Sequence, residues 1–344
     1  MTLSHVKIVG SGLIGTSIGL ALALKNVGVT MQDVDLRAQG LADDLIKSPS
    51  TDPVDLVIFA TPIGALEMVL NREFEANPNT AFIDISSVKS KVKVEVSTSS
   101  LPINRFLPTH PMAGREVGGA ESARADLFQG RPWIIDSHGV DDDVAQKATA
   151  LIELLGGHAI DLDSAEHDKA VALVSHLPQL VASLLAKQLH GGEERWLDLA
   201  GAGLRDTTRI AGSDSKLWRE IITANSQAIT PLLLSLQNDL SELIGSLDNE
   251  DSVARLISDG QSGRARIPGK HGGKAREYTY LPIVIEDKPG QLAALFEECA
   301  TASVNVEDLT IEHSPGQFTG LITLALSDSD AETLAAHLKA HGWS

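Results

Sequence analysis

Cysteine, positive charge and long apolar runs are all scarce in this sequence of 344 residues. The single cysteine, Cys299, excludes an intrachain disulfide framework and fits a reducing compartment. No basic segment with a cleavage site precedes the apolar start of the chain, and no uninterrupted apolar run approaches the roughly 20 residues that span a bilayer. We therefore expect a cytoplasmic protein with neither a signal peptide nor a membrane segment.

Positive residues are outnumbered, because 28 Lys and Arg face 46 Asp and Glu and leave a net charge of −18. A phosphate backbone needs a partner of the opposite sign, so we expect no nucleic acid partner. An anionic small molecule would require positive groups concentrated at its site. Each histidine or arginine in a candidate site is therefore more informative than usual.

Residues 1–163 alternate short apolar strands with helical segments, which predicts an α/β domain built on a doubly wound parallel sheet. The unbroken apolar run at 56–60 is typical of a strand covered on both faces. We expect strands at His5–Val9, Val29–Asp33, Val54–Ala60, Thr80–Ile85, Arg105–Pro108 and Trp133–Asp136, with one more at His158–Leu162.

Residues 164–259 lose the strand pattern and take on helical periodicity. An apolar stripe at three- and four-residue spacing is the strongest example and comprises Ile229, Leu232, Leu233, Leu236, Leu240, Leu243, Ile244 and Leu247. This apolar content exceeds the need of one small bundle. We therefore expect an all-helical domain that forms a homodimer.

Residues 260–276 are rich in glycine and basic residues and predict an exposed linker. Residues 277–344 then predict the order β-α-β-β-α, a small ferredoxin-like α+β domain that lacks the usual fourth strand. The expected elements are Tyr278–Glu286, Gly290–Ala302, Val304–His313, Phe318–Leu326 and Asp330–His341.

The run Gly10-Ser11-Gly12-Leu13-Ile14-Gly15 follows the first strand and opens a helix, which is the context that a dinucleotide-binding fingerprint requires. The first glycine permits a tight turn, the second lets the backbone approach a pyrophosphate, and the third allows close packing of helix and strand. The helix N-terminus would face the phosphates.

Asp33 ends the second strand, at about the spacing of an acid that binds the ribose 2′-hydroxyl. A carboxylate there repels a 2′-phosphate and favours NAD, although Asp35 could be the relevant acid and Arg37 could accept the phosphate of NADP. Thr61 and Pro62 follow the third expected strand, Val54–Ala60, where the cofactor would cross the carboxyl edge of the sheet.

Three further segments carry chemistry-bearing side chains. They are residues 84–89 (DISSVK), residues 109–116 (THPMAGRE) and, in the helical half, 174–178 (VSHLP) with 204–211 (LRDTTRIA). In this order they resemble the prephenate and arogenate dehydrogenase family across essentially the whole chain. Residues 287–292 (DKPGQL) resemble the opening of an ACT-type amino-acid-sensing domain.

The resemblance implies an NAD-dependent enzyme of tyrosine biosynthesis that oxidatively decarboxylates prephenate. Hydride leaves the ring carbon that carries the hydroxyl, CO₂ leaves the opposite carbon, and the ring becomes aromatic. A group near neutral pKa must take up or polarise the hydroxyl proton, and histidine suits this role. By resemblance the group is His110.

The resemblance assigns four more substrate contacts. Ser87 would hydrogen-bond the same hydroxyl, or could instead cap a helix. Arg209 would clamp the ring carboxylate, or could instead pair with Asp206 on the surface. His176 would lie near the substrate or in the core, and Glu116 would lie near the substrate side chain, although it could pair with the preceding arginine.

The resemblance also implies an amino-acid effector, tyrosine or phenylalanine, at the turn from Asp287 to Gly290 with Asn305 as a possible partner. The alternative is a domain that only stabilises the dimer. We expect no metal, because we find no histidine-pair or Cys-rich ligand spacing and the coming aromaticity already activates the leaving group.

Three alternatives remain. Arogenate could replace prephenate, because the two differ only in the side chain. A β-hydroxyacid dehydrogenase would need a catalytic lysine, and nothing around Lys169 or Lys187 resembles that motif. A sensor that binds NAD and an amino acid without turnover would not need His110, Ser87 and Arg209 together.

Overall fold

The computed structural model describes residues 3–115, 117–267, 278–313 and 319–343. The chain forms two compact units, Met1–Asp239 and Leu240–Ser344. The helix α11 (Ser226–Gly245) runs from the first unit into the second. Glu116 and most of the expected linker fall outside the described residues.

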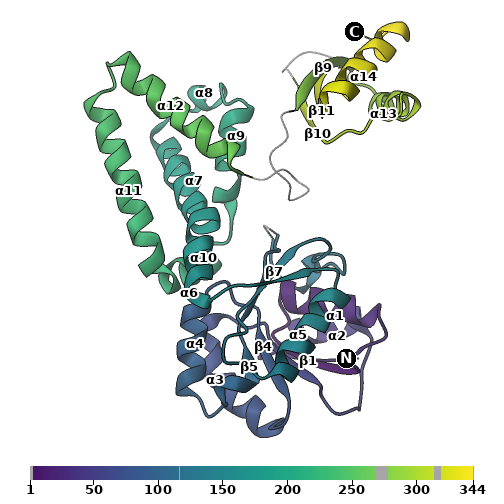
Figure 1. The fold of residues 1–344 in the computed structure, drawn as a ribbon, viewed down its shortest axis with the longest axis vertical. Coiled ribbons are helices and arrows are strands. Elements are labelled where there is room, and N and C mark those ends of the chain that lie inside the picture. The colour runs from purple at the N-terminus through teal and green to yellow at the C-terminus, as the bar shows by residue number, and fades with distance from the viewer. Residues whose placement is uncertain (1–2, 116, 268–277, 314–318, 344) are drawn as a thin grey trace. The chain divides into compact units, whose positions relative to one another are not determined.

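The first unit begins with a five-stranded parallel sheet in the order β2-β1-β3-β4-β5 (Figure 1). Its strands are β1 (His5–Val9), β2 (Gly28–Gln32), β3 (Leu56–Phe59), β4 (Ala81–Asp84) and β5 (Phe106–Leu107). All four residues of β3 are buried, as expected for a strand covered on both faces. The strand order reverses between β1 and β3, so a crevice is expected at their carboxyl ends.

Helices cover both faces of this sheet and give it two separate apolar cores. The helices α1 (Leu13–Ala23), α2 (Leu36–Ile46) and α5 (Asp142–Leu154) contribute to one core, while α3 (Ile63–Ala76) and α4 (Lys89–Thr98) contribute to the other. The fold is therefore the predicted doubly wound α/β arrangement.

A second sheet of three strands, β6 (Thr109–Pro111), β7 (Pro132–Ile135) and β8 (His158–Asp161), lies beside the first. The prediction that the segments at 133–136 and 158–162 extend the parallel sheet is wrong, because β7 pairs with β8 and runs antiparallel to β6. The apolar pattern marks a buried strand but does not name its neighbour. The short 3₁₀ helices η1 (Ile103–Arg105) and η2 (Ala120–Ser122) complete this domain.

The helical half begins with one continuous run. It comprises α6 (Ser164–Val171), a π-helical segment η3 (Ala172–His176), α7 (Leu177–Gln188) and η4 (Leu189–Gly191). Pro178 at the start of α7 cannot donate a backbone hydrogen bond, and the expected kink takes the form of the π segment. The remaining helices are α8 (Glu194–Leu197), α9 (Ala202–Thr208), η5 (Arg209–Gly212) and α10 (Ser215–Ala224).

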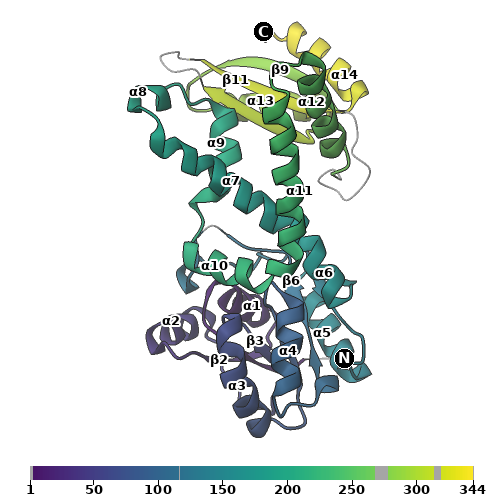
Figure 2. The same cartoon turned by 90° about the vertical axis from the view of Figure 1, so that its left-hand side faces the viewer.

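The helix α10 lies against the dinucleotide domain (Figure 2). Ile221 of α10 packs against Ile63 and Val88, which begin α3 and precede α4. This small apolar cluster joins the helical half of the first unit to the edge of the sheet where ligands are expected.

The run Ser164–Gly191 has a window of mean hydropathy 1.4 of which 28% is buried. By length and composition alone, this one helix of the described chain could cross a membrane, although polar and charged residues interrupt its apolar sequence. A core helix of a soluble protein passes the same test. Its buried polar residues His167 and Asp168 bind the dinucleotide domain, which places the start of the run inside the folded unit.

The helix α12 (Glu250–Ala265) corrects the expected linker, since helix continues through residues 260–265. Glycine at 260 and 263 each costs roughly 1 kcal/mol in a helix interior, an amount that flanking helix-forming residues can offset. Composition alone therefore placed the end of the helix too early.

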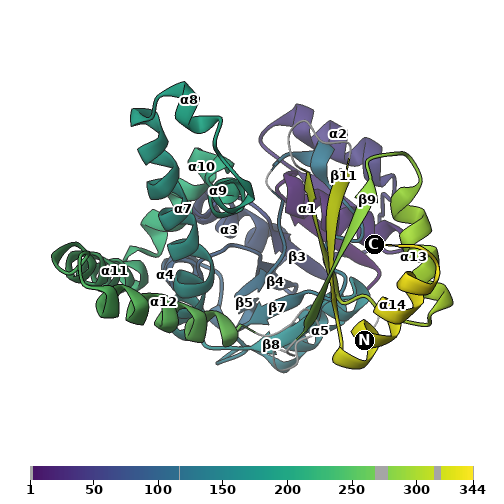
Figure 3. The same ribbon diagram turned by 90° about the horizontal axis from the view of Figure 1, so that it is seen from above.

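The C-terminal strands form an antiparallel sheet in the order β10-β11-β9. The elements are β9 (Thr279–Glu286), α13 (Gln291–Thr301), β10 (Asp308–His313), β11 (Thr319–Leu326) and α14 (Asp328–Ala340), in the predicted β-α-β-β-α order. Both helices lie on one side of β9 and β11 (Figure 3) and share an apolar core with them. Residues 304–307, expected to begin a strand, precede β10.

Candidate active site

The turn between β1 and α1 has the geometry of a phosphate cradle. Gly10 has φ of +115°, and a Cβ added there would lie 2.3 Å from the carbonyl oxygen of Ala60. A Cβ on Gly15 would lie 2.1 Å from the carbonyl oxygen of Gly10, whereas nothing lies within 4 Å of a Cβ on Gly12. The first and third glycines thus permit the turn and the helix packing, and Gly12 faces open space.

Two buried hydroxyls at this turn have no hydrogen-bond partner among the described residues, the Oγ of Ser11 and the Oγ1 of Thr61. Buried polar atoms are normally paired, so both fit a bound polar ligand. Leu13 and Ile14 open α1, and Pro62 is the N-cap of α3. The residues present therefore fit a dinucleotide across the carboxyl ends of β1 and β3.

Asp33 accepts a hydrogen bond from the backbone N–H of Ser11 at 2.6 Å, which places its carboxylate beside the glycine-rich turn. Asp35 instead caps α2 and accepts from the N–H groups of Arg37 and Ala38. The geometry thus favours Asp33 over Asp35 as the acid that meets the ribose.

His110 lies on β6, beyond the carboxyl end of β5, and a buried network fixes its backbone. The Nζ of Lys89 donates to Asp84 and to the carbonyl of Thr109, at 2.5 Å each. Asp84 also accepts from the N–H of Thr109 at 3.1 Å, and Trp133 donates its indole N–H to the Thr109 hydroxyl at 2.9 Å. A buried ion pair and an indole thus position the residue that precedes His110.

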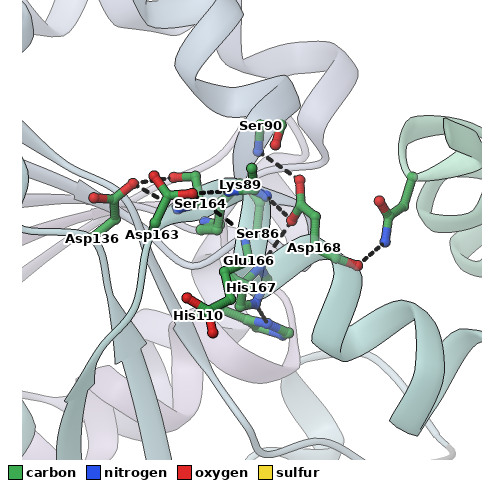
Figure 4. Close-up of polar contacts among 12 residues, drawn as sticks. Ser86, Lys89, Ser90, His110, Asp136, Asp163, Ser164, Glu166, His167 and Asp168 are labelled. Atoms are coloured by element: carbon green, nitrogen blue, oxygen red, sulfur yellow. Dashed lines mark hydrogen bonds and ion pairs between the residues drawn. The ribbon is translucent and has the colours of Figure 1, made fainter. Parts of the chain in front are cut away.

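His167 and Asp168 on α6, which sequence reasoning missed, form a hydrogen-bonded row with His110 (Figure 4). The Nδ1 of His110 lies 2.9 Å from the Nε2 of His167, and the Nδ1 of His167 lies 2.8 Å from the Oδ1 of Asp168. Asp168 also accepts from the N–H groups of Lys89 and Ser90 at 2.8 Å each, so its carboxylate caps α4 from another helix. A His-Asp pair one turn into a helix was the available sequence signal.

The imidazole of His110 is held neutral by its surroundings. Burial lowers the pKa of His110 well below its usual value, electrostatic interactions with His167, Lys89 and His176 lower it further, and Asp168 opposes them. A neutral imidazole has one nitrogen that can accept a proton, which is the requirement for a general base.

His176 is 2% exposed and closes the π segment. The amide of Asn225 donates to the carbonyl of Asp168 at 2.8 Å and lies 3.0 Å from the Nδ1 of His176. A carbonyl only accepts, so the nitrogen of the amide faces both atoms and the Nδ1 of His176 is an acceptor. Burial lowers the pKa of His176 to about 4, and Trp218 stacks edge-on against its ring.

Ser87 and Arg209 stand in different parts of the first unit. Ser87 precedes α4, but the N-cap is Val88 and the carboxylate that caps the helix belongs to Asp168, so the capping alternative for Ser87 is wrong. Arg209 is exposed and begins η5. Gln179 of α7 donates to the carbonyl of Ile210 at 3.0 Å, which ties this segment to the helix that follows His176.

Two of the expected effector residues, Asp287 and Gly290, lie at the start of α13, whereas Asn305 lies between α13 and β10. Gly290 is its N-cap with φ of +92°, and nothing lies within 4 Å of a Cβ added there. Asn305 donates to Glu307 at 3.0 Å, and Asp287 is exposed. The turn is thus open, with helix N–H groups at its end.

The statement that no histidines have paired ligand spacing is wrong at His337 and His341, which are one helical turn apart. With Glu298 they form a group whose potential metal-binding atoms lie within 4.8 Å of one another. Asp136, His138 and Asp163 form a second such group. The carboxylate of Asp136 is already engaged by Lys93, His138 and Ser164.

Comparison with known proteins decides the family. The chain matches a model described as the nucleotide-binding domain of prephenate dehydrogenase over residues 20–161, and one described as its dimerization domain over 163–257. A cyclohexadienyl dehydrogenase of Zymomonas mobilis is 31% identical over 76% of this chain and 95% of the relative. The chain belongs to the prephenate dehydrogenase family. It is an NAD-dependent dehydrogenase.

Other similar proteins carry names of the same family. A probable prephenate dehydrogenase of Streptomyces niveus is 29% identical over 98% of each chain, so that alignment includes the C-terminal unit. An arogenate dehydrogenase of Synechocystis has 25% identity and a TM-score of 0.64 over 76% of this chain and 98% of its own. A prephenate dehydrogenase of Aquifex aeolicus, solved with hydroxyphenyl propionate and NAD⁺, shares the fold with a TM-score of 0.67 over 77% of this chain and 98% of its own, at 24% identity.

Proposed function

We propose that the protein catalyses the NAD-dependent oxidative decarboxylation of prephenate to 4-hydroxyphenylpyruvate, in the cytoplasm, as a step of tyrosine biosynthesis. The observation that carries the proposal is the position of His110, which is partly buried beyond the carboxyl end of β5 and whose pKa is lowered by that burial. The glycine-rich turn ends at the same edge, because the strands that precede both are parallel.

The residues supply proton handling and orientation. NAD, when bound, accepts the hydride that leaves the hydroxyl-bearing ring carbon. His110 accepts the hydroxyl proton and returns it to the ring oxygen once CO₂ has left the opposite carbon, so no net proton is released. The Ser87 hydroxyl has no partner among the described side chains and would hydrogen-bond the same oxygen. Glu116 would lie near the substrate side chain.

Arg209 would clamp the ring carboxylate, since a guanidinium fork binds a carboxylate bidentately. The tie from Gln179 to Ile210 supports this role, because it joins the arginine segment to the helix of His176. Arg209→Gln is expected to raise the substrate KM at least tenfold with a smaller effect on kcat. Arg195→Gln, on an exposed side chain of α8, is the matched control, and an unchanged KM would assign Arg209 to the surface-pair alternative.

The deciding experiment follows NADH or NADPH absorbance with prephenate and arogenate in parallel, each with NAD and with NADP. Turnover of prephenate with NAD is the expected result. Bound NAD without turnover of either substrate would overturn the proposal in favour of a sensor or a different hydroxyacid substrate.

Arogenate is the second candidate substrate. The Synechocystis arogenate dehydrogenase shares the fold over 76% of this chain, and the residues proposed to contact the ring would be common to both substrates. The ratio of kcat/KM for the two substrates in the same assay decides between them.

We also propose that the chain forms a homodimer through the helical half. The apolar stripe at residues 229–247 is uncovered at its C-terminal end within one chain: Ile229 is 1% exposed, but Leu240 is 54%, Ile244 70% and Leu247 67% exposed. The match to a dimerization domain over the same residues supports this assignment.

Residues 277–344 are proposed to form an ACT-type domain that binds tyrosine or phenylalanine at Asp287, Gly290 and Asn305. The open turn at Gly290 supports this role. Gly290→Asp is expected to abolish both amino-acid binding and feedback inhibition. Gly342→Asp is a matched control, because Gly342 also has positive φ and open space around it. Unchanged inhibition in Gly290→Asp would leave the domain a purely structural role.

A further inference from the structure

When His167 is neutral, the hydrogen bonds that run from Asp168 through His167 to His110 have one consistent direction. Burial alone would raise the pKa of Asp168, but hydrogen bonds from His167, Ser90 and Lys89 lower it, so the carboxylate is ionised and can only accept. The Nδ1 of His167 therefore donates to Asp168, and in a neutral His167 the Nε2 is then the acceptor. The Nδ1 of His110 must then donate to His167, which leaves the lone pair of His110 on Nε2.

We propose that His167 and Asp168 are positioning residues that hold His110 in the Nδ1–H tautomer, so that its Nε2 accepts the proton of the ring hydroxyl. The proton leaves the substrate oxygen for Nε2, the O–H electron pair stays on that oxygen, and the proton returns after decarboxylation. This inference rests on the proposed function only for the identity of the hydroxyl.

Asp168 also connects the His110–His167 pair to the rest of the site. Asp168 caps α4, and the segment before α4 carries Ser87. Its backbone carbonyl binds Asn225, which orients His176. One residue of α6 thus sets the tautomers of His110 and His176 and anchors the loop of Ser87.

The test combines kinetics with NMR of the full-length protein. Asp168→Asn and His167→Phe are expected to lower kcat roughly 10- to 100-fold, a part of the 10²–10⁴ that general base catalysis contributes. The KM for prephenate and the Kd for NAD are expected to stay within about threefold. Asp198→Asn, on an exposed aspartate, is the matched control. Parallel losses of kcat, NAD affinity and thermal stability would indicate a merely structural role.

The tautomer itself is measured on ¹⁵N-histidine-labelled protein in complex with NAD. The expected spectrum shows His110 protonated on Nδ1, with that preference lost in Asp168→Asn. Protonation on Nε2 in the unmodified chain would overturn the inference. Because this measurement needs no turnover, it tests whether His167 and Asp168 set the tautomer of His110 even if the proposed reaction is wrong.

A second inference rests on the C-terminal unit alone. His337 and His341 lie one turn apart on α14, and Glu298 reaches them from α13. The Nε2 of His337 is 2.6 Å from Glu298, and the Nδ1 of His341 is 2.9 Å from the carbonyl oxygen of His337. A second nitrogen that donates to a backbone carbonyl is the usual support of a metal-binding histidine, and it leaves the Nε2 of His341 for the ion.

We infer that these three side chains bind a borderline divalent cation of the zinc class. Two imidazoles and one carboxylate are a common zinc set, and a fourth position would remain for solvent. The ion would replace the proton shared by Glu298 and His337 and would fasten α13 to α14. His337 is 18% and Glu298 24% exposed, so an ion can reach the site.

Calorimetric titration of the EDTA-treated full-length protein with ZnCl₂ tests this inference. One ion per chain is expected, with a rise in melting temperature. His341→Gln, which leaves the Glu298–His337 pair intact, is expected to weaken that binding at least tenfold. His158→Gln, on an exposed histidine of the other unit, is the control. Equal zinc binding by both variants would show an adventitious ion only and overturn the inference.

Discussion

The imidazole of His110 is where the proposed chemistry is most sharply testable. His110→Asn removes the proton acceptor but leaves the glycine-rich turn untouched. We expect kcat to fall at least 100-fold with an unchanged NAD affinity. Steady-state kinetics and calorimetric NAD titration measure the two quantities. Near-normal turnover would remove His110 from the reaction.

The pH dependence of the same residue follows from its surroundings. Burial and neighbouring positive charges lower the pKa of His110, so protonation, which inactivates a base, occurs only in more acidic solution. We expect kcat/KM to stay level from about pH 8 down through the ordinary histidine value of about 6.5 and to fall only below it. An acid limb at or above that value would contradict the assignment.

His176 is expected to make the free energy of unfolding depend on pH. Its folded-state pKa is about 4, lower than the ordinary histidine value of about 6.5, so acid protonates the unfolded chain first. Its contribution is present above about pH 6.5 and is lost as the pH falls towards 4, up to about 3 kcal/mol. Denaturant unfolding at pH 7 and pH 4.5 should show a larger loss for the natural chain than for His176→Gln. Equal losses would contradict this account.

At the scale of an element, substitutions of the glycines in the β1–α1 turn should separate stability from NAD binding. Gly12→Ala places a methyl group in open space, so the free energy of unfolding should change by about 1 kcal/mol or less while NAD affinity falls at least tenfold. Gly10→Ala should instead destabilise the fold by more than about 2 kcal/mol, because of positive φ and the contact with Ala60. Calorimetry and denaturant unfolding separate the two effects. Undiminished NAD affinity in Gly12→Ala would place the pyrophosphate elsewhere.

Elements also show where local pattern stops being informative. The segment at 133–136 was expected as a strand and is one, yet its sheet was predicted wrongly. Apolar periodicity records whether a segment is buried, not which strand lies beside it. Likewise, the end of α12 depends on its own backbone hydrogen bonds, and glycine content misplaced it.

The whole molecule is proposed to be a dimer, and α11 offers the test. Leu240→Asp combined with Ile244→Asp puts two charges into the exposed apolar stripe, and burying an unpaired charge at an interface is costly. Light scattering after size-exclusion chromatography should give half the mass of the unmodified protein. Asn238→Asp, off the stripe on the same helix, should keep the larger mass. If the Leu240→Asp, Ile244→Asp double variant had the same mass as the unmodified protein, the stripe would be excluded from the interface.

The sequence by itself determined the features that depend on neighbours along the chain. The glycine fingerprint, the alternation of strand and helix, the stripe of α11 and the C-terminal β-α-β-β-α order could all be predicted from it, because spacing fixes local conformation and the buried face. The motif residues His110, Ser87 and Arg209 came from resemblance.

Only the tertiary structure decided which of these side chains work together. Asp168 meets the N–H of Lys89 across 79 positions of the sequence, and His167 meets His110 across 57. No periodicity encodes a hydrogen bond at such separation, because it depends on how α6 packs against α4 and β6. The ionised carboxylate behind His110, and with it the nitrogen that can take a proton, therefore became visible only in the folded chain.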